Sequence, residues 1–312
     1  MKTPPATLAD LAPHVLRSRL EKGVLAWRLG AVTVRARSRL ALLGESLREI
    51  YGAHPLSDPD MDGIDFGVIL DRPASPLGRL RGQIAFESEG EAPFEPLTPK
   101  HVTPMLEWGL NWCIARHANW HLMIHAASLH RNGQALVLPG PPGTGKSTLC
   151  AALVHAGWEL LSDEFALISL DDGMLYPLWK PISLKNRALD LFRERESVRL
   201  TQQTFDSLKG RIGFWCLDFG PGGYSQWPAI PAWIAQLEYR PGAPLQVQQM
   251  RKSEAFLTLA QNSFNYSSLG ERGFSSLFSM VEACECFDFH YSDLENAVAL
   301  FDDLSGERRA SA

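Results

Sequence analysis

The chain has 312 residues, of which 45% are hydrophobic and 21% are charged, as is typical of a folded protein with one large or two modest domains. Thirty basic and 35 acidic residues give a formal net charge of -5, so no basic excess indicates nucleic acid or an anionic membrane as a partner. Five irregularly spaced cysteines predict reduced thiols in a cytoplasmic protein. No run approaches the roughly 18 apolar residues of a membrane span.

The N-terminal part of the chain predicts a small α/β portion, residues 1–102, without a recognisable chemical motif. Within it, residues 24–37 alternate between apolar and polar residues as in one strand. A helix over residues 103–120 is expected to connect this portion to the remaining domain, residues 121–305.

Residues 140–148 match the phosphate-binding pattern GxxxxGK[S/T], also called Walker A. The candidate binding residues are Gly140, Pro141, Pro142, Gly143, Thr144, Gly145, Lys146, Ser147 and Thr148. A strand-like run precedes the loop and a helix-like run follows it, which is the context that the pattern requires. The loop's backbone N–H groups and the helix N-terminus would surround a polyphosphate, while Lys146 would reach the β and γ phosphates and Ser147 would bind Mg²⁺. The sequence therefore predicts a nucleoside triphosphate site.

Asp163 and Glu164 follow the strand that comes after the loop's helix. A helix crossover makes this strand parallel to the loop's strand, so that both strands end on the phosphate side. Two carboxylates there can hold Mg²⁺ and orient or deprotonate an attacking hydroxyl. The alternative interpretation is a solvated acidic turn.

Further candidates flank this site. His125, on the strand before the loop's strand, is either a packed histidine or one that tunes a neighbouring carboxylate. Lys185, Asn186 and Arg187 are candidate phosphate or substrate contacts, because phosphoryl transfer benefits from an extra cation; their alternative is to face water. Residues 187–230 show no sustained periodicity, which predicts an irregular segment and a candidate lid.

Several segments resemble the catalytic domain of bacterial HPr kinase/phosphorylase. They are residues 124–127, the phosphate loop with its helix, and residues 157–164 with the following hairpin. Residues 181–186, 237–242 and 262–266 more closely resemble the branch called HPr-related kinase A. The similarity covers about residues 121–300.

This resemblance implies an ATP-dependent protein serine kinase with a P-loop domain akin to phosphoenolpyruvate carboxykinase, a mixed sheet with flanking helices. It implies that Lys146 and Ser147 serve ATP and Mg²⁺. It also implies that Asp163, assisted by His125, acts as the base toward the substrate hydroxyl, and that Glu164 binds Mg²⁺. The chain departs from the family at Glu164, where the family ordinarily has Asp, and at residues 183–186, which differ from its glutamate-containing signature.

We therefore expect a cytoplasmic kinase that uses Mg²⁺ and ATP to phosphorylate a hydroxyl, above all that of serine, on a protein or peptide. No nucleic-acid or membrane partner is expected. Two alternatives stay open: a nucleotide-binding switch or ATPase without kinase activity, and a kinase for a small-molecule hydroxyl. Relatives assemble into hexamers, so a homo-oligomer is a further expectation from kinship alone.

Overall fold

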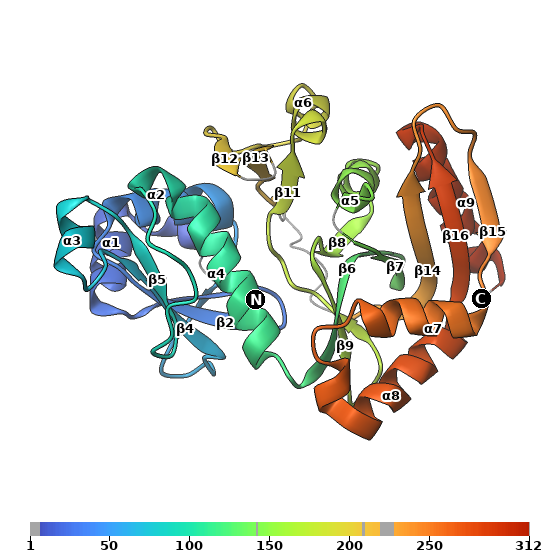
Figure 1. Ribbon diagram of the computed structural model, residues 1–312, viewed down its shortest axis with the longest axis horizontal. Helices are drawn as coiled ribbons and strands as arrows, with labels where there is room; N and C mark the ends of the chain where they lie inside the picture. Colours follow the sequence, from blue (N-terminus) through green and yellow to red (C-terminus); the bar gives the residue numbers. More distant parts are fainter. Residues whose placement is uncertain (1–6, 142, 208–209, 219–227, 312) are drawn as a thin grey trace, which may run out of the picture. The chain divides into compact units, whose positions relative to one another are not determined.

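The computed structural model describes residues 7–141, 143–207, 210–218 and 228–311, and the chain divides into two compact units (Figure 1). The first unit comprises Met1–Ala118 and Lys185–Gly222, and the second comprises Asn119–Leu184 and Gly223–Ala312. Each mixes helices with strands in both orientations, which confirms a mixed α/β fold with flanking helices. The predicted connecting helix belongs to the first unit, because α4 (Val102–His117) packs on two strands of its sheet.

The first unit is built on a five-stranded sheet in the order β3-β1-β2-β4-β5. Its further elements up to α4 are α1 (Pro13–Lys22), β1 (Leu25–Arg28), β2 (Thr33–Arg37), α2 (Ala41–Tyr51), β3 (Leu56–Ser57), β4 (Phe66–Asp71), α3 (Pro76–Leu80) and β5 (Ala85–Glu87), with short 3₁₀ turns at Leu8–Asp10 and Pro99–His101. The helix α2 packs through Leu43, Leu47 and Ile50, all fully buried, which lie on one side of a helix because they recur every three or four residues.

Residues 24–37 form two strands, so the prediction of a single strand is wrong. The antiparallel strands β1 and β2 are joined by a tight turn, in which Leu29 N–H donates to Val32 O over 2.7 Å. Gly30 has a φ of 78°, a conformation that glycine adopts at little cost. Apolar and polar residues alternate on both sides of the turn, so the pattern alone does not indicate where the first strand ends.

The described part of residues 187–230 also differs from the predicted irregular segment. It contains α6 (Arg187–Arg193), β12 (Phe205–Ser207), β13 (Gly210–Trp215) and the start of β14. Phe205, Ile212 and Phe214 form a small buried cluster, which explains how short elements without a long period hold together. Residues 208–209 and 219–227 of this segment lie outside the described residues.

The second unit is built on an eight-stranded mixed sheet, in the order β10-β9-β6-β7-β14-β16-β15 with β8 also paired to β6. Its elements are β6 (His121–Arg131), β7 (Gln134–Pro139), α5 (Lys146–His155), β8 (Glu159–Ser162), β9 (Phe165–Ser169), β10 (Leu175–Tyr176), β14 (Ile230–Tyr239), β15 (Gln246–Gln249), α7 (Lys252–Gln261), α8 (Tyr266–Ala283), β16 (Glu285–Tyr291) and α9 (Leu294–Ser311). The chain passes from this unit to the first within β11 (Ile182–Lys185).

Strand directions decide which loops meet at one edge of this sheet. The strand β6 is antiparallel to β7 and also to β8 and β9, so these three strands run in the same direction. In addition, β14 runs parallel to β7 and to β16. The strand β8 therefore runs parallel to β7, as the helix crossover predicts. The two strands are not neighbours, because β6 lies between them. The carboxyl ends of β7, β8, β14 and β16 point to the same edge.

Helices cover both faces of the sheet (Figure 1). The helices α5 and α9 pack against each other, α5 on β6 and α9 on β16, while α8 contacts β6, β14 and β16. Ile124, Ile234 and Cys286 from the sheet and Leu259 and Leu277 from α7 and α8 share one buried cluster. This two-sided packing fixes the strands that carry the candidate site.

Candidate functional site

The loop after β7 has the backbone of a phosphate cradle. Gly140, Gly143 and Gly145 have φ values of 140°, 95° and 100°. Residues other than glycine rarely adopt such angles, because their Cβ atom clashes with the backbone. A Cβ on Gly145 would also lie 2.7 Å from Tyr291 Oη. The glycines at these positions are thus required by conformation and, at Gly145, by close packing. Pro142, a predicted member of the loop, lies outside the described residues.

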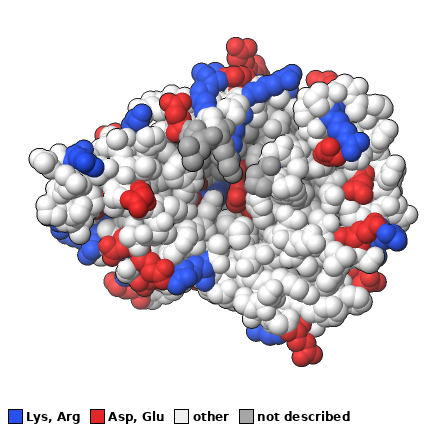
Figure 2. All heavy atoms as spheres, viewed as in Figure 1, with Lys and Arg blue, Asp and Glu red and all other residues white. Residues whose placement is uncertain are grey.

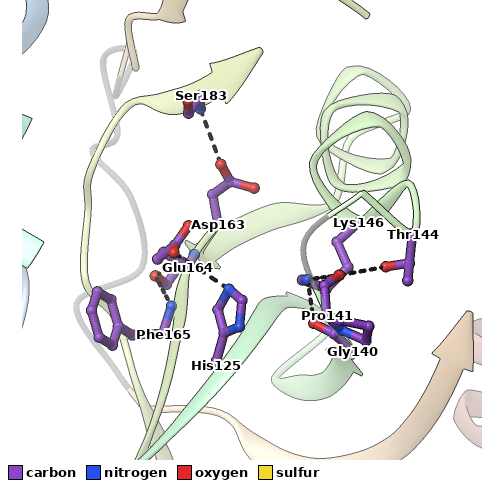
Figure 3. Close-up of polar contacts among 10 residues, drawn as sticks. His125, Gly140, Pro141, Thr144, Lys146, Asp163, Glu164, Phe165 and Ser183 are labelled. Carbon is purple, nitrogen blue, oxygen red and sulfur yellow. Dashed lines mark hydrogen bonds and ion pairs between the residues drawn. The ribbon is translucent and has the colours of Figure 1, made fainter. Parts of the chain in front are cut away.

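Side chains of the loop fold back on its own backbone (Figure 3). Lys146 Nζ donates to Gly140 O and, over 3.0 Å, to Pro141 O, and its residue is only 7% exposed. Thr144 Oγ1 donates to Pro141 O over 3.1 Å. Lys146, Ser147 and Thr148 form the first turn of α5, so the ammonium group, the hydroxyls and the partial positive charge of the helix N-terminus gather at one place.

The two acids lie where the strand register brings them close to this loop. Asp163 and Glu164 form the break between β8 and β9, which both pair with the same side of β6. Ser162 is opposite Ser128 and Phe165 is opposite His125, while Ala126 is opposite Pro139, the residue before the loop. The acids and the start of the loop are therefore separated by β6 alone, which corresponds to roughly 10 Å between backbones. As predicted, the acids directly follow the end of a strand, β8; the chain then bends and continues as β9 along the same side of β6.

The acids contact different partners (Figure 3). His125 Nε2 lies 3.3 Å from Glu164 Oε1, with the Glu164 side chain 44% exposed. Asp163 is 5% exposed, and its Oδ2 accepts the N–H of Ser183 over 3.0 Å. Both residues lie at the bend between β8 and β9, and their carboxylates have different partners. His125 is thus no isolated core histidine, and the acid it contacts is Glu164.

Electrostatics link Asp163 to the helix that follows the loop. Burial raises the pKa of the Cys150 thiol, and the negative charge of Asp163 raises that pKa further. Cys150 lies three residues after Ser147 and four after Lys146, so all three share one side of α5. The Asp163 carboxylate therefore lies within electrostatic range of Cys150, one turn beyond the start of α5.

Two tyrosines that sequence reasoning missed lie on the other side of the loop. Tyr239 ends β14 and Tyr291 ends β16, and their rings meet edge to face at 5.6 Å between centroids. Tyr239 N–H donates to Thr144 O over 3.2 Å, and Tyr291 Oη lies 3.4 Å from Gly145 O. Tyr239 is 38% exposed. The parallel course of β14 could have indicated these residues, since parallel strands end at one edge.

A third residue that sequence reasoning missed, Phe264, borders His125. His125 N–H donates to Asn262 O over 2.7 Å, and Phe264 N–H donates to Met123 O over 2.9 Å. The Phe264 ring lies 6.0 Å from that of His125 and 5.0 Å from that of Phe165. Phe264 is 46% exposed. It therefore forms a partly exposed apolar side of the site next to the His125–Glu164 pair.

The predicted basic contacts belong to the first unit. Asn186 has a φ of 49° and exchanges backbone and side-chain hydrogen bonds with the backbone of Arg211, at 2.9 and 3.0 Å. Lys185 ends β11 and Arg187 begins α6. The contact of Lys185, Asn186 or Arg187 with a phosphate stays a prediction.

The residues present fit a magnesium ion that arrives with a nucleotide. Among the described residues, no group of three or more His, Cys, Asp and Glu side chains could hold a metal ion. Mg²⁺ usually takes one or two carboxylates, with substrate phosphates and water completing its shell. Ser147, Asp163 and Glu164 supply a hydroxyl and two carboxylates near the loop, which suits this kind of site.

Comparison with known proteins adds no assignment. The chain matches no protein-family model, and no curated protein matches it. None of the helices in the described ranges has the length and apolar character needed to cross a bilayer. On the face seen in Figure 2, acidic and basic side chains are interspersed. The assignment of function therefore rests on the geometry of the site and on the sequence resemblance.

Proposed function

We propose that this protein is a Mg²⁺- and ATP-dependent kinase of the P-loop type that resembles HPr kinase, and that it phosphorylates a hydroxyl, above all serine, of a protein or peptide. One observation carries the proposal: the pairing of β7, β6 and β8 brings the glycine loop, His125 and two carboxylates close together where β7 and β8 end. Phosphoryl transfer needs this combination of an anion cradle, a metal-binding carboxylate and a group that orients the acceptor hydroxyl.

The loop would hold the triphosphate. Its backbone N–H groups and the N-terminus of α5 favour negative charge, and Lys146 would exchange its loop carbonyl partners for phosphate oxygens. This exchange is favourable because an ion pair with phosphate is stronger than a hydrogen bond to a neutral carbonyl. Mg²⁺, when bound, neutralises charge that develops on the phosphates.

We assign the two acids by their contacts. The resemblance implies that Asp163 is the base and Glu164 the metal ligand, but the contacts favour the reverse. Asp163 is buried and its charge raises the pKa of Cys150, which lies one turn after Ser147 on α5; this supports a role beside Mg²⁺. Glu164 is more exposed and contacts His125, which supports the pair as the group that orients the acceptor hydroxyl and takes its proton.

The nucleotide would lie across the loop in one direction. The acids are on the β6 side of β7, so the reacting end of the triphosphate points there. The base and ribose then extend toward β14 and β16 on the opposite side, where Tyr239 is partly exposed. An aromatic ring there can stack on a base of any identity, so the contacts support Tyr239 as the platform for the base.

All five cysteines are buried free thiols, which supports the proposed cytoplasmic location, since disulfides are rare in that reducing compartment. A fold does not determine which molecule receives the phosphoryl group. Identifying this acceptor therefore distinguishes the proposal from the two alternatives.

The deciding experiment incubates the protein with Mg²⁺ and ATP labelled in the γ-phosphate, in an extract of the cells that produce it. The Lys146→Ala variant is the matched control. We expect label in a polypeptide with the native protein and none with the variant. Label in a metabolite would indicate a small-molecule kinase. ATP hydrolysis, or ATP binding alone, without a labelled acceptor would indicate an ATPase or a nucleotide switch.

A further inference from the structure

The first unit carries a groove on the exposed side of its sheet. Two hollows of about 770 and 330 Å³ adjoin there, and both are lined by Arg37, Ile69 and Glu87. Arg37 of β2 is opposite Ile69 of β4, which is opposite Glu87 of β5. Residues opposite each other in adjacent strands share a face, so these three side chains form one row across the groove.

A line of arginines forms one wall of the groove. Arg35 and Arg37 are exposed, and Arg39 follows at the same spacing, while Ala36 and Ser38 between them are buried. Alternate residues of an extended chain lie on one side and about 7 Å apart. The guanidinium groups of this wall are therefore spaced like the alternate side chains of an extended peptide.

The larger hollow concentrates this positive charge. Arg37, Arg39, Arg72 and Arg79 all line it. Throughout the part of the chain that the structure describes, no carboxylate lies within 4.0 Å of any of these four guanidinium groups. Arg79 Nε donates to Pro73 O over 3.0 Å, so its other N–H groups and the guanidinium groups of Arg37, Arg39 and Arg72 are the donors that can bind an external anion.

Three acids, Glu21, Asp71 and Glu87, line the same hollow, and two of them have other hydrogen-bond partners. Glu21 Oε1 accepts from Arg17 Nε over 2.9 Å. The Asp71 carboxylate accepts the backbone N–H groups of Arg72, over 2.7 Å, and Arg39, over 3.3 Å. With four arginines and three acids around it, the hollow keeps a small excess of positive charge.

The floor and the opposite wall restrict what can bind. Ile69, Leu40 and Leu42 supply apolar surface, as in sites for organic ligands. Glu87 stands on β5, two strands away from β2, so the walls are roughly 10 Å apart, about the width of one extended chain. An acidic wall facing the arginines disfavours a nucleic acid, whose charge is negative throughout.

We propose that this groove binds an extended peptide segment, of another protein, with acidic side chains at alternate positions. Its carboxylates would pair with Arg37, Arg39, Arg72 and Arg79, since arginine and carboxylate form strong bidentate hydrogen bonds. The strand β2 is already paired on both edges, with β1 and β4, so recognition uses side chains and not strand addition. This inference concerns the first unit only and does not rest on the proposed kinase activity.

The test measures fluorescence anisotropy of a labelled eight-residue peptide with glutamate at every second position and threonine between. A peptide of equal composition with its four glutamates adjacent is the sequence control. We expect the full-length protein, without nucleotide, to bind the alternating peptide at least tenfold more tightly than the control peptide. Equal affinity for the two peptides, or no saturable binding, would overturn the proposal.

Two protein variants locate the site. Arg37→Gln/Arg39→Gln should weaken binding of the alternating peptide at least tenfold. Arg28→Gln/Arg193→Gln removes the same charge from exposed arginines outside the groove and should change the affinity less than twofold. Equal losses in both variants would reveal non-specific attraction. Displacement of the peptide by inorganic pyrophosphate or a DNA oligonucleotide at lower concentration than by unlabelled peptide would assign the groove to those ligands and overturn the peptide proposal.

Discussion

His125 Nε2 lies 3.3 Å from Glu164 Oε1, whereas the adjacent Asp163 turns to the N–H of Ser183. Two consecutive acids therefore have different surroundings, one beside an imidazole and partly exposed, the other buried near the helix that follows the phosphate loop. Two carboxylates with different surroundings can take different roles in one reaction.

Asp163→Asn and Glu164→Gln should separate those roles. Because Asp163 is assigned to the metal side, its asparagine variant should raise the Mg²⁺ concentration for half-maximal transfer about tenfold or more. Glu164→Gln should lower the transfer rate by about 10²-fold or more, the usual size of general-base effects, with little change in Mg²⁺ dependence. Steady-state kinetics with varied Mg²⁺ measures both quantities. The opposite pattern would restore the assignment that the sequence resemblance implies.

Gly145→Ala and Gly143→Ala form a matched pair. Both glycines have positive φ, 100° and 95°, so each alanine adds strain of about 1–2 kcal/mol. A Cβ at Gly143 meets nothing within 4 Å, whereas one at Gly145 lies 2.7 Å from Tyr291 Oη. Gly145→Ala should therefore lower the free energy of unfolding by about 1 kcal/mol or more beyond Gly143→Ala.

Chemical denaturation measures this difference, and Tyr291→Phe provides its control. Removing the hydroxyl in the Gly145→Ala background should recover at least half of the excess loss. If Gly145→Ala and Gly143→Ala destabilise the protein equally, or if Tyr291→Phe recovers no stability, the contact with Tyr291 Oη does not explain the requirement for glycine at position 145.

The phosphate loop and the direction of its neighbouring strands could be predicted from the sequence, because the motif fixes a local strand, turn and helix. The partners of Asp163 and Glu164 could not, since they depend on how β8 and β9 align with β6. The place of Tyr239 beside the loop could not be predicted either. This residue lies about ninety residues beyond the loop in the sequence and reaches it only because β14 pairs in parallel with β7. The turn at Gly30 was hidden because hydrophobic alternation continues through it.

Tyr239→Ala tests the direction of the nucleotide. If the base stacks on this ring, the variant should bind ATP about tenfold more weakly, in line with a stacking contribution of about 1–3 kcal/mol. Its affinity for inorganic tripolyphosphate should stay within about twofold, because this ligand has no base. Titration calorimetry measures both affinities, and Phe278→Ala, which truncates a 50% exposed ring on α8, is the control. Equal weakening of both ligands would indicate damage to the loop instead.

His121 should make the folding stability of the protein depend on pH. Its residue is 5% exposed, and burial lowers its pKa to about 4, against the opposing charges of Asp172 and Asp171. In the unfolded chain the pKa is about 6.5, so as the pH falls the unfolded state binds the proton first. The stabilising contribution is complete above about pH 6.5 and is lost progressively toward pH 4. Between pH 7 and pH 5 the loss should be about 2 kcal/mol.

Urea denaturation of the native protein and of His121→Gln at pH 7 and pH 5 measures this contribution. The variant has no group that titrates at this position, so its free energy of unfolding should fall less than that of the native protein over the same interval, by about 2 kcal/mol. The ring of His121 packs edge to face on Tyr176, 5.3 Å away, so the variant loses stability at both pH values, and only the difference between them is diagnostic. Parallel losses in the two proteins would mean that His121 does not carry the acid sensitivity.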